Sequence, residues 1–353
     1  MANKDLLELL NNMDKEPETP SSQHERVLFI DGLNLFFRNF AMLNIVNEHG
    51  VHVGGLGGFV RSLGTLINAI QPTAMYVIFD GENSSINRKN ILSEYKAGRH
   101  QSRITNWEIF DDVGDEHDAK LDQIVRLIDY LKCLPVKTIA LDKVEADDII
   151  AHLATTITNT HDNSRAFIVS SDKDFIQLTS NKICVYRPIE KDFYTPETVI
   201  TKFNVLPENF ILYKVLMGDA SDKIPGIKGL GEKKLRKLFP ELNERKLTLD
   251  NIFEIAAEKH KEHLIYSRIV LEEQSLRKNY KIMDLHNPMV DDLEKAYLEE
   301  QIDIDPPLLN PKAFLRFYQE DGLRHLIKNP EFWVNNQFQT LNSFVTDSKE
   351  LEI

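Results

Sequence analysis

Apolar residues in the first two hundred positions form short runs that are separated by longer segments of helical spacing. Five runs have the length of buried strands, and four intervening segments place apolar residues three or four positions apart, as a helix does. Short strands that alternate with amphipathic helices predict an α/β fold, in which helices cover both faces of a mainly parallel sheet. The expected strands are 27–30, 75–79, 138–141, 166–169 and 183–187, and the expected helices are 32–43, 54–67, 120–134 and 148–157.

The strand pattern ends near residue 200, and the segments 203–217, 233–239 and 252–259 that follow have helical spacing only. This change predicts a second, all-helical domain. The polar ends of the chain are expected to be loosely held tails, and the leucines of the first one permit either a frayed helical turn or a docking peptide for a partner. The expected divisions are a tail at 1–24, an α/β domain at 25–200, a helical domain at 201–338 and a tail at 339–353.

Length and composition agree with a two-domain protein that buries a substantial core. The chain has 353 residues, 42% of them hydrophobic, and no stretch reaches the roughly 20 apolar residues that a membrane helix needs. The N-terminus lacks the basic and apolar regions of a signal peptide. Cys133 and Cys184 stand alone, without the spacing of a zinc site, which favours a reducing cytoplasm.

Nine acidic residues stand where a predicted strand or turn ends. Carboxylates at the carboxyl ends of parallel strands meet in one crevice, and so many of them require cations between them. Each one alone has an ordinary explanation as a helix cap or turn residue, but three within positions 145–148 exceed what capping needs. The set predicts two Mg²⁺ ions and phosphoryl transfer on a nucleic acid. Its members are Asp31, Asp80, Glu145, Asp147, Asp148, Asp172, Asp174, Asp219 and Asp222.

Basic residues are concentrated between the second and third expected strands, although the net charge of the chain is −13. They form either an ordinary solvated loop or a cationic segment that binds phosphates near the scissile bond. The segment follows Asp80 directly, which favours phosphate binding. Tyr95 and Trp107 are candidates for stacking on a base, or for anchoring the loop. The cations of this segment are Arg88, Lys89, Lys96, Arg99 and Arg103.

A second basic element begins four residues after Asp222. Glycines in a tight turn let backbone N–H groups approach a phosphate, and the turn has the spacing of a helix–hairpin–helix, which holds duplex backbone without reading sequence. The glycine-rich step at 54–58 lacks the Lys-Ser/Thr of a nucleotide-binding loop. The expected DNA-binding residues of the second element are Gly226, Lys228, Gly229, Gly231, Lys233, Lys234, Arg236 and Lys237.

The order of these motifs resembles the 5′-nuclease or flap-endonuclease family. The blocks IDGLNLFFR, FDG, EYKAGR, EADDII, SSDKDF and GDASDKIPGIKGLGEKKL occur in family order, over about residues 26–240. The family includes phage 5′-exonucleases and the 5′-nuclease domain of bacterial DNA polymerase I, and the size of this chain is most similar to the RNase H enzymes of T-even-type phages. The resemblance implies a PIN-like domain with a helical arch, here at about 83–118, and a SAM-like helix–three-turn–helix motif at about 215–240.

Site residues carry over by motif. The nine acidic residues take the metal positions of the family, which bind Mg²⁺ or Mn²⁺. Lys96 and Arg99 fall in the arch motif, where Ala97 and Gly98 replace the Gly and Asn that are usual in the family. Arg38 matches a basic residue of the active site, so Lys96, Arg38 and Arg99 are the expected catalytic cations. In the family the hairpin binds K⁺ through backbone carbonyls, which makes the 226–231 turn a candidate K⁺ site.

The resemblance implies a structure-selective 5′→3′ exonuclease and flap endonuclease that acts on DNA and RNA–DNA hybrids and removes RNA primers or 5′ flaps. The chain is expected to be a monomer without membrane contact, in a bacterial cytoplasm if it is phage-encoded. A single-strand-binding protein or a sliding clamp is a candidate partner. Two alternatives stay open. A PIN-type ribonuclease would not need the duplex-binding turn, and a silent DNA-binding scaffold would keep the acidic cluster at an electrostatic cost.

Overall fold

A six-stranded sheet organises the chain, in the order β3-β2-β1-β4-β5-β6. The computed structural model describes residues 22–98 and 104–350. The first five strands are parallel, and β6 pairs antiparallel with β5. The expected α/β class with a mainly parallel sheet is therefore confirmed. The strands are β1 (Arg26–Asp31), β2 (Ala74–Ile78), β3 (Lys137–Ile139), β4 (Arg165–Val169), β5 (Ile183–Arg187) and β6 (Asp192–Tyr194).

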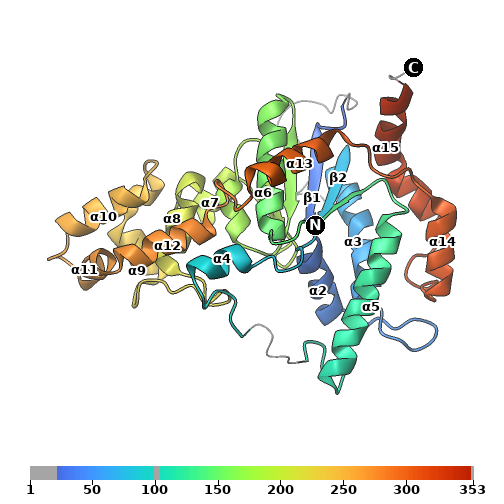
Figure 1. Cartoon of the computed structure of the whole chain (residues 1–353), viewed down its shortest axis with the longest axis horizontal. Coiled ribbons are helices and arrows are strands. Elements are labelled where there is room, and N and C mark those ends of the chain that lie inside the picture. Colours follow the sequence, from blue (N-terminus) through green and yellow to red (C-terminus); the bar gives the residue numbers. More distant parts are fainter. Residues whose placement is uncertain (1–21, 99–103, 351–353) are drawn as a thin grey trace.

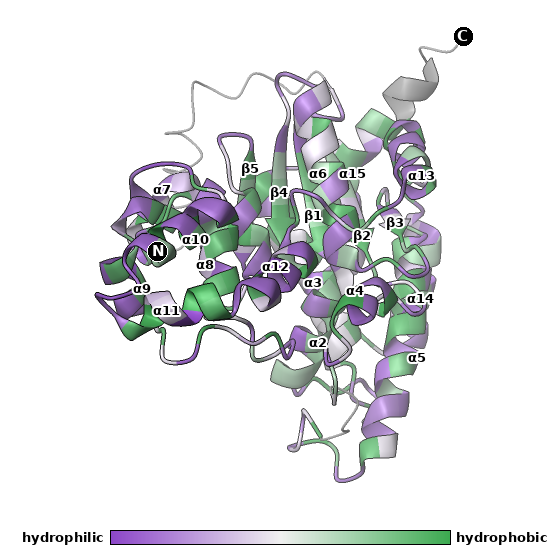
Figure 2. Ribbon diagram, turned by 60° about the vertical axis from the view of Figure 1, so that its left-hand side comes forward, coloured by the Kyte–Doolittle hydropathy of each residue, from purple (hydrophilic) through white to green (hydrophobic). Residues whose placement is uncertain are grey.

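Helices cover both faces of this sheet because side chains alternate along each strand. On β1, Val27 and Phe29 point into a core with α6 (Ala146–Thr160), whereas Leu28 and Ile30 point into a second core. The second core is closed by α2 (Gly32–Met42), α3 (Gly54–Ile70) and α5 (Val113–Leu131). Figure 2 shows the apolar strands enclosed between these helices.

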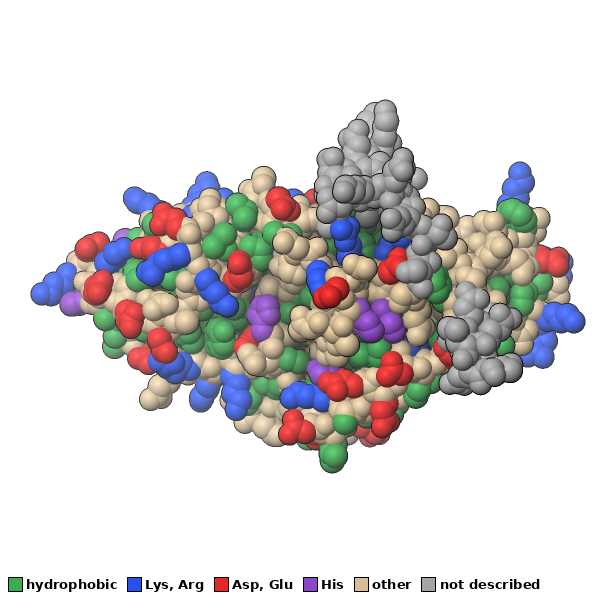
Figure 3. Space-filling view, turned by 90° about the horizontal axis from the view of Figure 1, so that it is seen from above, with side chains coloured by type: hydrophobic (Ala, Val, Ile, Leu, Met, Phe, Trp, Pro, Cys, Tyr) green, Lys and Arg blue, Asp and Glu red, His purple; other side chains and the backbone are tan. Residues whose placement is uncertain are grey.

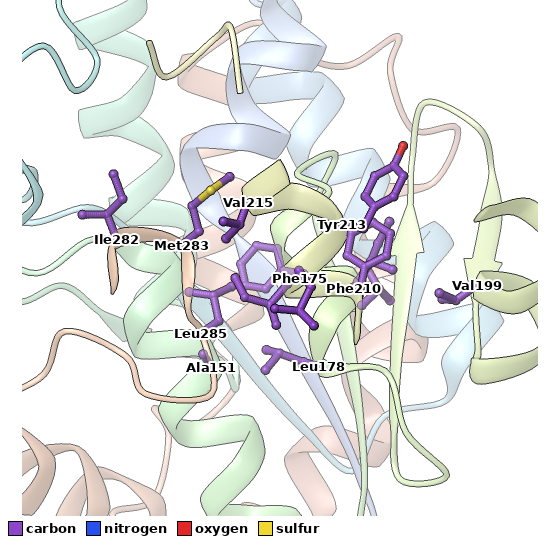
Figure 4. Close-up of a cluster of buried hydrophobic side chains, with 14 of the residues drawn as sticks. Ala151, Phe175, Leu178, Val199, Phe210, Tyr213, Val215, Ile282, Met283 and Leu285 are labelled. Atoms are coloured by element: carbon purple, nitrogen blue, oxygen red, sulfur yellow. The ribbon is translucent and has the colours of Figure 1, made fainter. Parts of the chain in front are cut away.

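The helical region after the sheet packs on the α6 side and shares its core. Phe175 and Leu178 of the short 3₁₀ helix η1 (Asp174–Leu178) contribute to the buried cluster in Figure 4, together with Phe210 and Met283. Figure 1 shows α9 to α11 at the far end of the molecule from α14. The helices and 3₁₀ turns are α7 (Pro196–Phe203), η2 (Pro207–Asn209), α8 (Phe210–Met217), α9 (Glu232–Leu238), η3 (Pro240–Asn243), α10 (Leu249–Glu258), α11 (Leu264–Leu271) and α12 (Glu273–Met283).

The last three helices return to the α/β part, which differs from the expected division at residue 338. α13 (Asp292–Asp303) packs on α6, and α14 (Pro311–Glu320) and α15 (Pro330–Glu350) close the core of α3 and α5. The expected tail at 339–353 is wrong for its first part, because Leu341 and Val345 are buried on α15. Polar residues dominate that segment, but Leu341, Phe344 and Val345 have the spacing of one helix face, which was the available signal.

Other elements also differ from the sequence expectation. The helix expected at 203–217 is interrupted, because Asn204 adopts a left-handed conformation that ends α7 before α8 begins. The strand β6 was not expected, since three residues give no detectable alternation. In the described part of the expected arch, the helices are α4 (Ile86–Ile91) and the first turns of α5. Among the described residues, no helix is long and apolar enough to cross a membrane.

Candidate active site

Three of the predicted acidic residues lie along the carboxyl edge of the sheet. Asp31 ends β1, Asp80 follows β2, and Asp172 follows β4. These strands are neighbours, and the chain crosses from β3 on one side of β1 to β4 on the other side. The crevice at such a crossing is where open α/β sheets bind ligands.

Asp31 and Asp80 are held by neutral donors. The Asn34 backbone N–H and the Ser170 hydroxyl donate to Asp31 at 3.1 and 3.0 Å, and the Ala146 backbone N–H donates to Asp80 at 2.7 Å. Burial raises the pKa of Asp31 to about 7, with a further contribution from the charge of Asp80, and burial also raises the pKa of Asp80. Both carboxyl groups would therefore be stabilised by a cation beside them.

Arg88 lies inside the acidic cluster, rather than on the surface that the sequence predicted for a DNA-binding cation. It is 3% exposed, and its Nη1 lies 2.6 Å from Glu145 and 2.5 Å from Asp148. Its Nη2 lies 3.4 Å from Asp147, and its Nε donates to the Ile282 carbonyl at 2.8 Å. Oxygens of the three acidic residues lie within 4.8 Å of one another. Nothing in the loop-like sequence around Arg88 indicates this burial.

Lys96 and Tyr95 also point into the cluster. The Lys96 ammonium lies 2.7 Å from Glu145, and the Tyr95 hydroxyl donates to Glu145 at 2.9 Å. Burial alone would lower the pKa of Lys96, but Glu145 and Asp147 outweigh it and raise that pKa, so the ammonium stays charged. Tyr95 is 2% exposed, which excludes the expected base stacking and supports the anchoring alternative. Trp107 is 75% exposed, and its stacking role stays a prediction.

A second buried cation, Lys214, was missed by the sequence analysis. Its ammonium lies 2.7 Å from both Asp174 and Asp219, and its side chain is 6% exposed. Burial raises the pKa of Asp174 to about 7, with a further contribution from Asp172. Lys214 sits in the apolar helix α8. A single lysine five residues before Asp219, in an otherwise apolar helix, was the available signal.

Asp219 and Asp222 reach the crevice from the loop after α8. Burial would raise the pKa of Asp219, but Lys214 outweighs it and lowers that pKa to about 2. The Asp222 carbonyl accepts from the Lys96 backbone N–H at 2.9 Å, and the charge of Asp222 also acts on the Lys96 ammonium. The charge of Asp147 also contributes to the raised pKa of Asp174. The acidic residues at 145–148 and those at 172–174, which come from separate motifs, therefore belong to one cluster.

The remaining predicted cations lie elsewhere. Arg38 on α2 is half-buried and donates to the Pro188 carbonyl at 2.9 Å, at the turn after β5. Lys89 is exposed next to the buried Arg88. Arg99 and Arg103 lie outside the described residues, so the expectations for them stay predictions.

The glycine-rich turn stands beside the loop of Asp219 and Asp222. Gly226 permits close backbone contact, because a Cβ there would lie 2.1 Å from the Met217 carbonyl oxygen, and Gly229 has φ +82°. Residues 229–234 line an open depression of about 530 Å³. Lys228, Lys233, Lys234 and Lys237 are exposed, and Arg236 is half-buried and donates to the Lys202 carbonyl. The predicted basic turn is therefore accessible from solvent.

The comparisons with known proteins agree with this arrangement. Residues 26–204, about half of the chain, match the family described as 5′-3′ exonuclease, N-terminal resolvase-like domain. The chain belongs to the 5′-3′ exonuclease family. It is 32% identical to DNA polymerase I of Bacillus subtilis over 69% of this chain and 26% of the relative, and 31% identical to that of Thermus thermophilus over 78% and 32%. The chain thus spans about a quarter to a third of the length of these relatives.

Solved structures show the same fold at low identity. A bacteriophage T5 flap endonuclease in complex with DNA and metal ions has a TM-score of 0.59 at 20% identity, over 86% of this chain and 99% of that one. Human GEN1 in complex with Holliday junction DNA has a TM-score of 0.53 at 13% identity, over 98% and 78%. The PIN-like family fold expected from the motifs is therefore confirmed, and the T5 match extends it into the helical region.

Proposed function

We propose that this chain is a divalent-metal-dependent 5′→3′ exonuclease and flap endonuclease that hydrolyses phosphodiester bonds in DNA and in RNA–DNA hybrids. The observation that carries the proposal is the convergence of nine carboxylates from both parts of the chain on the carboxyl edge of β1, β2 and β4. Burial, with a further contribution from neighbouring carboxylates, raises the pKa values of Asp31, Asp148 and Asp174 to about 7, so a cation beside these groups would favour their charged forms.

The contacts separate carboxylates that face a buried cation from carboxylates that accept only from neutral donors. Glu145 and Asp148 face Arg88, and Asp174 and Asp219 face Lys214. In the described part of the chain, the donors recorded for Asp31, Asp80 and Asp172 are neutral N–H and O–H groups. We therefore assign the principal Mg²⁺ or Mn²⁺ positions to Asp31, Asp80 and Asp172. Asp147, whose contact with Arg88 is the longest of the three at 3.4 Å, is assigned as a further ligand, with the other acids around them. Seven to nine acids suit two ions that keep several waters each.

When bound, the ions would lower the pKa of the attacking water and neutralise charge on the phosphate. The chain itself holds Lys96 charged at the edge of the cluster, where its ammonium can meet negative charge that develops on the scissile phosphate. Arg38 stands at the turn after β5 and could approach the same phosphate. Arg88 and Lys214 act differently, because both are buried and orient carboxylates.

The substrate follows from the surfaces next to this site. A duplex would lie on the basic turn at 226–237, whose lysines contact phosphates without reading sequence. The 5′ end or flap would then pass the segment of Lys96, Arg99 and Arg103 to reach the carboxylates. Such an activity would remove RNA primers and 5′ flaps during replication, in the cytoplasm of a bacterial host if the chain is phage-encoded. A single-strand-binding protein or a sliding clamp stays a candidate partner of the monomer.

The deciding experiment is cleavage of a 5′-labelled flap substrate, with and without Mg²⁺, by the wild type and by Asp172→Ala. We expect metal-dependent cutting near the junction that the substitution abolishes, while flap binding is retained. Cutting of single-stranded RNA alone would favour the PIN-type ribonuclease. Tight flap binding without cutting by either protein would favour a silent scaffold.

A further inference from the structure

Four of the six backbone carbonyls of the 226–231 turn, those of Ile227, Lys228, Gly229 and Gly231, accept hydrogen bonds from protein donors. Arg268 Nη1 on α11 donates to the Lys228 carbonyl, and Lys234 Nζ on α9 donates to the Gly229 carbonyl at 2.8 Å. Next to the turn, the Pro225 carbonyl accepts from Asn279 Nδ2 at 2.7 Å, and the Asn279 side chain is almost fully buried. Within the turn, the Ile227 carbonyl accepts from the Leu230 N–H, and the Gly231 carbonyl accepts from two N–H groups of α9.

This arrangement does not fit the K⁺ ion that the family resemblance implies for the turn. A K⁺ ion bound by backbone needs several carbonyl oxygens directed at one point, and a cationic side chain that is already bonded to such an oxygen repels the ion. At Lys228 and Gly229 the donors are a guanidinium and an ammonium. Gly229 has φ +82°, a left-handed conformation that glycine adopts without strain.

We propose that Arg268 and Lys234 take the place of a monovalent ion in this turn, so that the duplex-binding surface forms independently of K⁺. Both cations come from the protein, one from α11 and one from α9, and they hold consecutive carbonyls of the same turn. The positive charge that an ion would bring to this surface is thus supplied by side chains. Duplex binding at the turn itself rests on the proposed function.

The proposed duplex surface also includes Arg268, which the sequence did not indicate. A guanidinium has five N–H donors, and one contact to the Lys228 carbonyl leaves others that can reach a phosphate. Arg268 is half-buried beside Gly229, where a Cβ would lie 3.1 Å from its Nη1. The hairpin motif ends on α9, and α11 begins 26 residues after the end of α9. No local sequence pattern therefore connects Arg268 with the turn. The proposed duplex surface therefore extends from the turn to α11.

The first measurement is the thermal unfolding midpoint of the full chain in KCl, NaCl and tetramethylammonium chloride at equal ionic strength. We expect the same midpoint in all three salts, because an ion that binds only the native state would raise it selectively. The second measurement is the affinity for a duplex with a recessed end in the same salts, by fluorescence anisotropy with EDTA present. Here we expect wild-type affinities that agree within about twofold among the salts.

The matched variants are Lys234→Met with Arg268→Met, and Lys233→Met with Lys237→Met. Both pairs remove two positive charges from this surface, but only the first pair removes the bonds to the Lys228 and Gly229 carbonyls. We expect the first pair to lose about tenfold more duplex affinity than the second, since hydrogen bonds to charged groups are lost together with charge. The first pair should also unfold at a lower temperature in every salt.

Two results would overturn the proposal. The first is a selective rise of the wild-type midpoint or affinity in KCl. The second is equal behaviour of the two variant pairs in both measurements. If the wild type binds no duplex in any salt, the proposed function fails, whereas the midpoints of wild type and variants still decide the question of K⁺.

Discussion

The carboxylates of the cluster differ in whether the protein supplies a cation beside them. Glu145 and Asp148 are almost fully buried and face Arg88, so the protein itself supplies their counter-ion. Asp31 faces no Lys or Arg side chain among the described residues, and burial raises its pKa to about 7, whereas Lys96 and Arg88 partly offset the effect of burial on the pKa of Asp80. Removing one partner of a buried ion pair strongly destabilises the folded protein. Removing the charge of a carboxylate that lacks a counter-ion instead increases the free energy of unfolding. Opposite stability effects follow for the two classes.

Arg88→Met should destabilise the protein by about 3–5 kcal/mol at neutral pH, because it leaves Glu145 and Asp148 buried without their cation. It also removes the bond from Arg88 Nε to the Ile282 carbonyl, which ties α4 to the end of α12. The measurement is urea unfolding without divalent metal. Lys89→Met is the matched control, since Lys89 is the exposed neighbour, and it should stay within about 0.5 kcal/mol. Equal losses would show that the ion cluster adds no specific stability.

Asp31→Asn should stabilise the metal-free protein at pH 8 and leave its stability at pH 4 almost unchanged. The pKa of Asp31 is raised to about 7 in the fold, so the folded state holds this proton more tightly than the unfolded state does. Its contribution to stability is therefore lost as the pH rises from about 4 to about 7, by on the order of 1–4 kcal/mol. Thermal unfolding in EDTA across this range tests the prediction. Asp118→Asn, at an exposed position, should give no such pH-dependent gain.

At the scale of elements, hydrophobic spacing was enough to place five strands and the helices between them. The expected and observed strands agree within one or two residues, because buried parallel strands are short and continuously apolar. The same spacing could not show that α14 and α15 return to α3. That contact depends on glycines of α3: a Cβ at Gly57 would lie 2.4 Å from Leu326 and one at Gly64 2.6 Å from Trp333.

Gly64→Ala should destabilise the protein by about 1–3 kcal/mol, although alanine favours a helix by about 1 kcal/mol over glycine. The added methyl group would overlap the Trp333 ring, which α15 holds against α3. Chemical unfolding of the single and double variants with Trp333→Leu measures the coupling. The loss of stability caused by Gly64→Ala should largely disappear when leucine replaces Trp333. A stabilising Gly64→Ala in the wild-type background would mean that α15 does not pack closely on α3.

At the scale of the whole molecule, the sequence indicated which acids meet but not how the protein balances them. Motif order placed nine carboxylates in one site, and the structure adds Lys214 and moves Arg88 from the surface into the cluster. Pairing of this kind depends on contacts such as that of Arg88 with Ile282, 194 positions away, which no local pattern encodes. Figure 3 shows acidic and basic side chains intermixed at the end of the molecule that holds α10 and α11, despite the net charge of −13.

Divalent metal should stabilise the whole molecule, since the excess negative charge is shared by carboxylates from β1, β2, β4 and the loop after α8. An ion that binds the native state alone adds about 2.7 kcal/mol at one hundred times its dissociation constant. We expect the unfolding midpoint to rise with Mg²⁺, and to rise more at pH 8 than at pH 5, because protons compete for Asp31 and Asp174 at the lower pH. Asp172→Asn should reduce the rise, whereas Asp122→Asn, at an exposed position on α5, should leave it intact. A Mg²⁺ response that is the same in both variants would place the ions outside the crevice, and no response at all would favour the silent scaffold.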